Sequence, residues 1–445
     1  MSPGPMNRRS FLGSAALAGA AATILPRRAL GMGRRAPSDT LNIACIGVGG
    51  MGEQDVRGVR GENIYALCDV DDRQAANSFR RFPEAKRYKD FREMLEKEGA
   101  NIDAVTVSTP DHTHAVASLM ALGMGKPVFC QKPLARLMGE VRAMRDAARR
   151  AGVPTQMGNQ GHAGDGTRRL REWYEAGAIG TVREIHYWTN RPIWPQAIQR
   201  PLEMYHVPAH LDWDLWLGPV PHRPYHPAYA PFRWRGWWDF GTGALGDIAC
   251  HSMDAAFWAL DLGFPETVTP ESSPLFEETA PASSRVVYDF PARGRRPAVR
   301  VVWRDGSFSP PRPGGIQEDE LWPLGGVGGQ LWMGDDGVLL ADPYGNDLRH
   351  LDKERDREFQ ENPPPERFPR SPGVYEEWIE ACKGGPPPNS TFDGHAGALT
   401  EMVLLGCLAV RAGRTLQVNP ASGRVTNLEL PKEWTEPTFR EGWSP

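Results

Sequence analysis

The sequence lacks an excess of basic residues, an apolar run long enough to cross a membrane, and more than a few cysteines. Lys and Arg total 51 against 55 Asp and Glu, a formal net charge of -4, whereas nucleic-acid binders usually carry a basic excess. No apolar stretch reaches the roughly 18 residues of a transmembrane helix. The 6 cysteines in 445 residues form neither a CxxC pair nor zinc-ligand spacing. We therefore expect no nucleic-acid partner, no stable membrane span, no metal site, and free, mostly buried thiols.

Acidic residues are absent from residues 1–38, and this segment has the pattern of an export signal. Arg8 and Arg9 precede the weakly apolar, Ala- and Gly-rich stretch Phe11–Leu25. The pattern resembles a twin-arginine (Tat) signal, which implies export of an already folded protein by the Tat machinery. We expect residues 1–38 to be the signal and a linker, and the protein to be periplasmic or otherwise exported.

An apolar strand that runs into a glycine-rich turn follows this segment. Residues 41–47 indicate a buried parallel strand, and residues 47–52 are G-x-G-x-x-G with one additional glycine. A helix and a second strand, Ile64–Cys68, are predicted next. This order is typical of a dinucleotide-binding unit that ends in an acid at the second strand. The residues expected to bind the cofactor here are Gly47, Gly49, Gly50, Met51, Gly52 and Asp69.

The glycines and the acid have separate physical roles in such a unit. Gly47 permits the tight turn, Gly49 lets the backbone approach the diphosphate, and Gly52 allows close packing of helix and strand. Asp69 favours NAD, because the 2′-phosphate of NADP would meet a carboxylate. Arg73 is the alternative partner for that phosphate, so NADP is the less favoured cofactor.

Three more predicted strands continue the alternation with helices. They cover residues 104–108, 127–130 and 155–157. Strands alternating with helices predict an α/β fold with a parallel, doubly wound sheet, whose ligands bind beyond the carboxyl ends of the strands. Further cofactor-binding candidates at or after these ends are Thr109, Pro110, His114, Gln131, Lys132 and Asn159.

The second part of the chain is rich in tryptophan. Eight of the 15 tryptophans lie within residues 188–258. Rigid aromatic faces suit stacking against the apolar faces of sugar rings, although most such residues belong to cores. Trp194, Trp237 and Trp238 are the predicted substrate-binding tryptophans.

A glycine-rich segment then predicts a helix over residues 243–260. Asp247 and His251 lie four residues apart and therefore on one face, and Asp254 continues that face as a candidate substrate contact. A carboxylate beside an imidazole raises its basicity and fixes its tautomer. Removal of a hydroxyl proton requires such a pair, but a surface Asp–His pair explains the spacing equally well.

Short predicted strands, such as residues 285–290 and 298–303, suggest a second sheet that is mainly antiparallel. Residues 325–329 favour a flexible turn, and late helices are predicted over residues 374–383 and 394–412. The predicted domains are the signal and linker (1–38), a Rossmann domain (39–158), and a substrate-binding and oligomerisation domain (159–445).

These motifs together resemble the Gfo/Idh/MocA family of oxidoreductases. The resemblance implies a Rossmann domain, a C-terminal α/β domain whose open sheet often makes oligomer contacts, a nicotinamide cofactor, and sugar, glycoside or cyclitol substrates. It places the catalytic lysine at Lys132 and the Asp-x-x-x-His pair at Asp247 and His251. The family's usual motif is Glu-Lys-Pro, whereas Gln131 precedes Lys132 here. A neutral amide stabilises the charge of Lys132 less than a carboxylate would.

The predicted activity is NAD-dependent oxidation of a secondary hydroxyl in a small carbohydrate, by a homo-oligomer. Because free dinucleotide should be scarce outside the cytoplasm, we expect the cofactor to be held tightly and regenerated in place. A redox-neutral glycosidase or lyase that works through transient C3 oxidation is the first alternative. A non-catalytic sugar-binding protein is the second.

Overall fold

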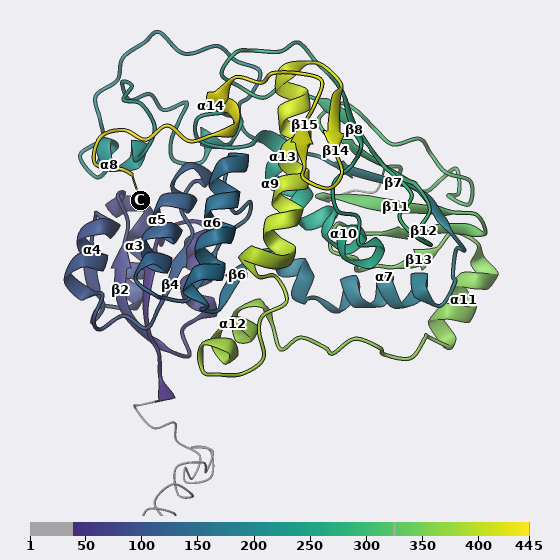
Figure 1. Ribbon diagram of the computed structural model, residues 1–445, viewed down its shortest axis with the longest axis horizontal. Coiled ribbons are helices and arrows are strands. Elements are labelled where there is room, and N and C mark those ends of the chain that lie inside the picture. Colours follow the sequence, from purple (N-terminus) through teal and green to yellow (C-terminus); the bar gives the residue numbers. More distant parts are fainter. Residues whose placement is uncertain (1–38, 324–325, 445) are drawn as a thin grey trace, which may run out of the picture. The chain divides into compact units, whose positions relative to one another are not determined.

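Two sheets organise the part of the chain that the computed structural model describes, residues 39–323 and 326–444 (Figure 1). The predicted export signal lies outside this part. The first sheet is built from the residues before Gly158, and the second from residues after it.

The first sheet is the predicted parallel, doubly wound sheet. Its strands lie in the order β3-β2-β1-β4-β5-β6, and each neighbouring pair is parallel. The elements are β1 (Asn42–Ile46), α2 (Met51–Gly58), β2 (Asn63–Cys68), α3 (Asp72–Arg81), β3 (Lys86–Tyr88), α4 (Phe91–Glu98), β4 (Ala104–Val107), α5 (Asp111–Gly123), β5 (Val128–Cys130), α6 (Met138–Ala151) and β6 (Thr155–Met157).

Burial explains which of these strands were predictable. Strand β4 is buried at every position, and Val105 and Val128 are fully buried, as in a sheet covered on both faces. Strand β3 was missed because it is a polar edge strand, Lys86-Arg87-Tyr88, with no hydrophobic pattern.

The second sheet is mainly antiparallel, as predicted. Its order is β13-β12-β11-β7-β10-β9-β8-β14-β15, and within the described residues only β7 and β10 pair in parallel. The strands are β7 (Val182–Thr189), β8 (Thr267–Ser272), β9 (Ser284–Phe290), β10 (Val299–Arg304), β11 (Gly328–Gly334), β12 (Gly337–Ala341), β13 (Arg349–His350), β14 (Leu416–Asn419) and β15 (Arg424–Val425).

Two predictions of local structure were wrong in part. Residues 326–327 form the expected turn, but residues 328–329 belong to β11, and residue 325 lies outside the described part of the chain. A Cβ on Gly328 would lie 2.0 Å from the Trp188 carbonyl oxygen, so glycine lets β11 approach β7. The expected helix over residues 243–260 is two helices, α9 (Gly243–Ser252) and α10 (Asp254–Leu260), separated at Met253.

The remaining helices cover the sheets, and one of them is a core helix. They are α7 (Asp165–Glu175), α8 (Trp213–Leu217), α11 (Lys353–Glu361), α12 (Val374–Cys382), α13 (Gly397–Ala412) and α14 (Lys432–Thr435). The stretch Phe392–Ala412 is long and apolar enough to span a membrane, but it is mostly buried inside the protein. All six cysteines are free, and all except Cys382 are buried, as expected.

A buried carboxylate joins three segments that lie far apart in the sequence. Asp254 accepts hydrogen bonds from Asn159 Nδ2 (2.8 Å), His162 Nδ1 (2.8 Å) and His395 Nε2 (2.6 Å). We call these four residues the Asp254 cluster. Burial opposes ionisation, but His162 and His395 outweigh it and lower the pKa of Asp254. Asp254 is 1% exposed, so the prediction that it contacts substrate is wrong.

Replacing Asp254 tests how much this cluster stabilises the fold. Asp254→Asn removes a charged acceptor of three hydrogen bonds, and we expect a loss of roughly 3 kcal/mol in the free energy of unfolding. Because the folded pKa is lowered, the carboxylate's contribution is present above the unfolded pKa and is lost as the pH falls through the acid range. Urea unfolding of wild type, Asp254→Asn and the exposed control Asp319→Asn measures this; equal stability of all three would contradict it.

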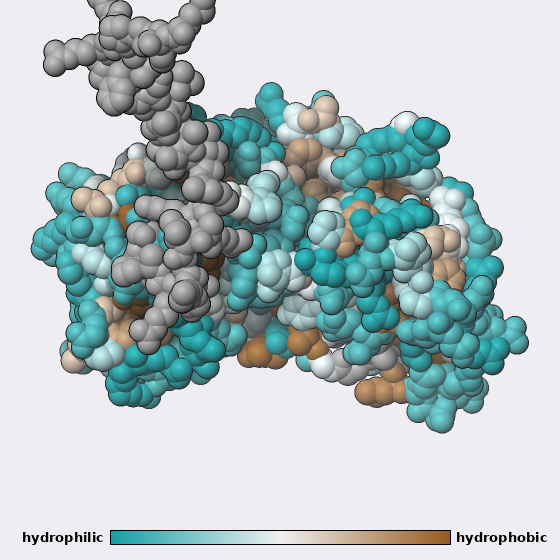
Figure 2. Space-filling model, turned by 90° about the horizontal axis from the view of Figure 1, so that it is seen from below, coloured by the Kyte–Doolittle hydropathy of each residue, from teal (hydrophilic) through white to brown (hydrophobic). Residues whose placement is uncertain are grey.

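The surface is largely hydrophilic on the face seen in Figure 2, where hydrophobic residues form small, separate areas. The irregular segment after β7 carries several exposed hydrophobic side chains. Exposed large hydrophobic side chains there are Ile193, Leu202, Met204, Tyr205 and Val207. The homo-oligomer stays a prediction.

Candidate active site

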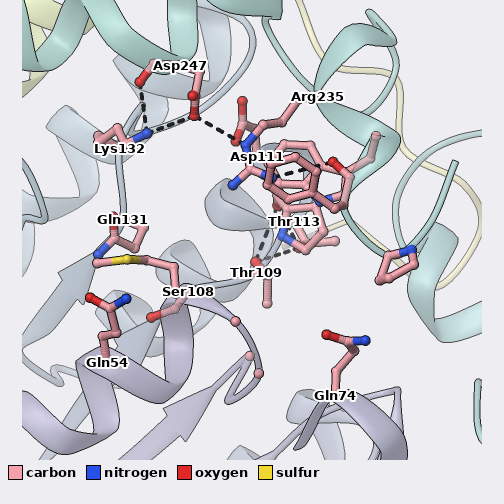
Figure 3. Close-up of a pocket in the computed structure, with 18 of the residues that line it drawn as sticks. Gln54, Gln74, Ser108, Thr109, Asp111, Thr113, Gln131, Lys132, Arg235 and Asp247 are labelled. Carbon is pink, nitrogen blue, oxygen red and sulfur yellow. Dashed lines mark hydrogen bonds and ion pairs between the residues drawn. The ribbon is translucent and has the colours of Figure 1, made fainter. Parts of the chain in front are cut away.

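A cleft of about 840 Å³ lies at the carboxyl ends of the parallel strands (Figure 3). One side is formed by residues after β1, β2, β4 and β5, and the other by segment 191–235, α9 and Tyr344. The sheet topology predicted this position. The predicted site residues that line it are Gly47, Gly49, Gly50, Met51, Asp69, Thr109, Pro110, Gln131, Lys132, Trp194, Asp247 and His251.

The glycine turn has the geometry that a dinucleotide requires. Gly47 and Gly50 have φ angles of 76° and 56°, a region that favours glycine. A Cβ on Gly52 would lie 2.0 Å from the Gly47 carbonyl oxygen, so glycine is needed for α2 to begin so close to β1. A Cβ on Gly50 would meet nothing within 4 Å. The start of α2 therefore faces open space, where helix N–H groups favour a phosphate.

Asp69 occupies the predicted place at the end of β2. Its carboxylate accepts from the backbone N–H of Val48 (2.8 Å) and of Asp71 (2.9 Å), and burial raises its pKa to about 6. It lines the cleft, where an acid suits ribose hydroxyls. Arg73 is exposed on α3 and does not line the cleft, whereas Gln74 does. The prediction of Arg73 as a cofactor contact is therefore not supported.

His114 and Asn159 lie behind the cleft rather than in it. His114 contacts the carbonyl oxygens of Pro133 through Nδ1 (2.9 Å) and of Thr109 through Nε2 (2.8 Å). It thus joins the ends of two strands and fixes the turn that carries Lys132. Asn159 is fully buried in the Asp254 cluster. Both predictions of direct cofactor contact are wrong: the His114 ring bonds to backbone carbonyl groups, and the Asn159 amide bonds to the side chains of Asp254 and Ser390.

Lys132 and Asp247 form the central contact of the cleft. Lys132 Nζ donates to the Asp247 carboxylate (2.8 Å) and to the Asp247 carbonyl oxygen (2.8 Å), and Arg235 Nε lies 3.3 Å from the same carboxylate (Figure 3). Burial opposes ionisation, but the two cations outweigh it and lower the pKa of Asp247 to about 2. Asp247 is therefore ionised and holds the Lys132 side chain in place.

His251 lines the cleft one turn beyond Asp247, as predicted. The expected hydrogen bond between the two is not made. Lys132 and Arg235 both contact Asp247 Oδ1. His251 Nδ1 is buried and has no hydrogen-bond partner in the described part of the chain. Burial, followed by the charge of Lys132, lowers the pKa of His251 to about 3. The ring is thus neutral at pH 7. The expectation that Asp247 raises the basicity of His251 is wrong, because burial and the charge of Lys132 outweigh the carboxylate.

Asp111 is a site residue that sequence reasoning missed. It is the first residue of α5, lines the cleft, and accepts from Thr242 Oγ1 at 3.0 Å. Burial, followed by the Asp247 charge, raises the pKa of Asp111 to about 7. Its position directly after the end of β4 was the available signal, since ligands bind at that edge.

This raised pKa gives a spectroscopic prediction. Asp111 should be protonated below about pH 7 and lose its proton above it. The infrared difference between wild type and Asp111→Asn should show a carboxylic-acid C=O band that disappears through neutral pH. A carboxylate band already complete at pH 5 would contradict the assignment.

Gln131 points toward Asp55 and away from Lys132. Its Nε2 lies 3.0 Å from both Asp55 oxygens, and the same carboxylate accepts from Ser108 Oγ (2.6 Å) and Tyr375 OH (2.7 Å). Burial raises the pKa of Asp55. A glutamate at position 131 would therefore place a second buried carboxylate against the first, which accounts for the departure from Glu-Lys-Pro.

Exchanging the two side chains tests this account. Gln131→Glu should cost roughly 3 kcal/mol of stability at pH 7, because two buried carboxylates repel. The penalty should shrink as the pH falls, since a raised folded pKa favours the protonated form at low pH. The double variant Asp55→Asn/Gln131→Glu restores one amide and one carboxylate and should recover most of the loss in a denaturant titration. A double variant no more stable than Gln131→Glu would refute the pairing.

Of the three predicted substrate-binding tryptophans, one lines the cleft, and its contact with substrate stays a prediction. Trp194 lines the cleft and donates from Nε1 to Gln196 Oε1 (3.0 Å). Trp237 and Trp238 are 0% and 8% exposed and belong to hydrophobic clusters. Flanking glycine does not separate a core tryptophan from a site tryptophan. The other aromatic side chains that line the cleft are Phe91, Trp216, Phe232, Trp234, Tyr344 and Tyr375.

Two family models match the chain across this site. The model described as "Oxidoreductase family, NAD-binding Rossmann fold" matches residues 41–159. The model described as "Oxidoreductase family, C-terminal alpha/beta domain" matches residues 181–290. Fold and site thus define a two-domain, NAD-binding oxidoreductase. The chain belongs to the Gfo/Idh/MocA family, as its motifs indicated.

The chain shares less than a third of its residues with individual relatives over the matched regions. The chain is similar to inositol 2-dehydrogenase of Burkholderia multivorans (31% identity over 153 residues, 33% of this chain and 45% of the relative). It is also similar to levoglucosan dehydrogenase of Pseudarthrobacter phenanthrenivorans (25% over 228 residues, 48% and 50%). The matches thus span about half of each relative. The solved structure of levoglucosan dehydrogenase with NADH and levoglucosan shares the fold, with a TM-score of 0.56 at 18% identity over 85% of this chain and 99% of that one.

Proposed function

We propose that the protein is an exported, NAD-dependent oxidoreductase that acts on a secondary hydroxyl of a sugar, glycoside or cyclitol. The observation that carries the proposal is the Lys132–Asp247 pair beside His251, in one cleft with the glycine turn. Relatives named inositol and levoglucosan dehydrogenase support the substrate class.

Side chains of the cleft can bind the hydroxyl group of the substrate and accept its proton. A bound nicotinamide would supply the hydride acceptor. Lys132, held in place by Asp247, donates a hydrogen bond to the reacting oxygen and stabilises its developing charge. His251 lines the cleft with a ring nitrogen, Nδ1, that has no partner among the described residues, and we assign this ring as the acceptor of the hydroxyl proton. Asp247 takes no part in proton transfer, because its pKa of about 2 keeps it ionised.

Two substitutions test these roles. Lys132→Ala and His251→Ala should each lower kcat/KM by roughly 10²–10⁴-fold, the usual contribution of acid–base groups. Lys97→Ala removes an exposed lysine that pairs with Glu93 and serves as the control. Single-turnover rates of reduction of the bound cofactor, measured over a series of sugar concentrations, give the effect. Near-normal turnover in both site variants would overturn the mechanism.

Export and cofactor retention are a joint part of the proposal. A twin-arginine pattern at Arg8 and Arg9 supports export, and an exported enzyme would lose a loosely bound dinucleotide. Protein purified without added cofactor and then denatured should release near-stoichiometric NAD, identified by mass spectrometry. An empty, folded protein would favour a freely exchanging dehydrogenase retained in the cell.

A redox-neutral glycosidase or lyase is the second candidate, and Asp111 favours it. Elimination after oxidation at C3 requires one group to remove the C2 proton and another to protonate the leaving oxygen. Asp111 gives the cleft a second proton-transfer group, with a pKa of about 7. Loss of C2 deuterium with release of the aglycone would indicate elimination, whereas a stable keto product would indicate oxidation. A sugar-binding protein without turnover would show neither product nor cofactor reduction.

A further inference from the structure

Arg191 lines the cleft without a carboxylate partner. Among residues 39–323 and 326–444, no Asp or Glu oxygen lies within 4.0 Å of its guanidinium nitrogens, the limit for an ion pair. Its Nη1 donates only to the neutral amide oxygen of Asn190. The other cations of the cleft each have a carboxylate: Lys89 has Asp72, and Lys132 and Arg235 share Asp247.

The backbone under Arg191 is held firmly. Its N–H donates to Thr189 Oγ1 (3.3 Å), and its carbonyl oxygen accepts from the Gly306 N–H (2.7 Å). The Asn190 N–H, one residue earlier, donates to the Val327 carbonyl oxygen (3.1 Å). The guanidinium therefore extends from a fixed base at the end of β7.

The surroundings of Arg191 place it on the substrate side of the cleft. Tyr344 and His251 line the same cleft, and their rings lie 5.3 Å apart in an edge-on contact. Arg191 follows β7 of the second sheet, whereas the glycine turn that fits the dinucleotide follows β1. Arg191 interacts electrostatically with Tyr344, which packs against His251. We therefore assign Arg191 to the part of the cleft that binds the substrate.

The charge balance of this side favours an anion. Lys132 and Arg235 both pair with Asp247, and the carboxyl group of Asp111 interacts electrostatically with both cations. Arg191 is the cleft cation that has no carboxylate partner among the described residues. A neutral sugar would leave its guanidinium without a counter-charge, whereas an anionic substituent would balance it. A planar fork of N–H donors matches a carboxylate through two parallel hydrogen bonds.

We propose that the substrate is a sugar that carries a carboxylate, a uronic acid or uronoside, and that Arg191 binds this carboxylate. The proposal rests on the proposed function, because it names the substrate class of the same site.

The test compares sugars that differ only at C6. Methyl glycosides of gluco, galacto and manno configuration are each offered as the neutral hexoside and as the hexuronoside. Binding to the purified holoenzyme is measured by calorimetry, and cofactor reduction by absorbance. In wild type, one hexuronoside should bind at least about 10-fold more tightly than its neutral counterpart, as a hydrogen-bonded charge pair provides.

Matched arginine variants assign the effect. Arg191→Gln should reduce the uronoside-to-hexoside affinity ratio by roughly 10- to 100-fold, and Arg191→Lys should fall between, because it keeps the charge and loses the fork. Arg233→Gln removes an exposed arginine that does not line the cleft and should leave the ratio unchanged.

The outcomes separate this inference from the proposed function. Neutral hexosides that bind as well as uronosides, or a ratio that Arg191→Gln leaves intact, would overturn the role of Arg191 while oxidation of the hexosides sustains the activity. Uronosides that bind through Arg191 but reduce no cofactor would support the subsite and contradict the oxidoreductase. Absence of binding by every sugar would overturn the inference.

Discussion

The site depends on the ion pair between Lys132 and Asp247. It joins the end of a Rossmann strand to a helix of the second domain, so a single buried contact fixes both parts of the reactive arrangement. Burial of two charges is costly unless further groups compensate. Here Arg235 supplies a second cation and the Asp247 backbone supplies a carbonyl acceptor. Because Asp247 is committed to this pair, proton transfer is left to His251 and Asp111.

A buried carboxylate needs hydrogen-bond donors or cations around it. This requirement also explains the identity of residues that lie away from the reacting groups. Asp55 accepts hydrogen bonds from three segments, and Asp254 joins the segment after β6 to the residues just before α13. Gln131 is an amide because its neighbour is already an acid. These carboxylates hold the strand ends and helices that shape the cleft, and so act on the chemistry only through position.

Much of this arrangement was predictable from the sequence, and the limits have physical causes. The glycine turn, Asp69 and Lys132 were identified because parallel-strand topology places residues at strand ends in one crevice. Helix spacing put Asp247 and His251 on one face, but spacing cannot show that Asp247 bonds elsewhere. Periodicity likewise does not reveal burial at single positions, which is why Trp237 was assigned to the site, nor the environment that makes Asp111 titrate near neutrality.

The most direct test of the account follows the hydrogen that moves from a ring carbon of the sugar to the nicotinamide. Purified protein with its bound dinucleotide is mixed with sugars deuterated at one ring carbon at a time, and the cofactor is analysed by mass spectrometry after a single turnover. The account predicts that deuterium from one carbon alone appears in the reduced nicotinamide, and that Lys132→Ala and His251→Ala slow its appearance. A cofactor that stays oxidised and unlabelled with every sugar that binds would contradict the assignment of this cleft to hydride transfer.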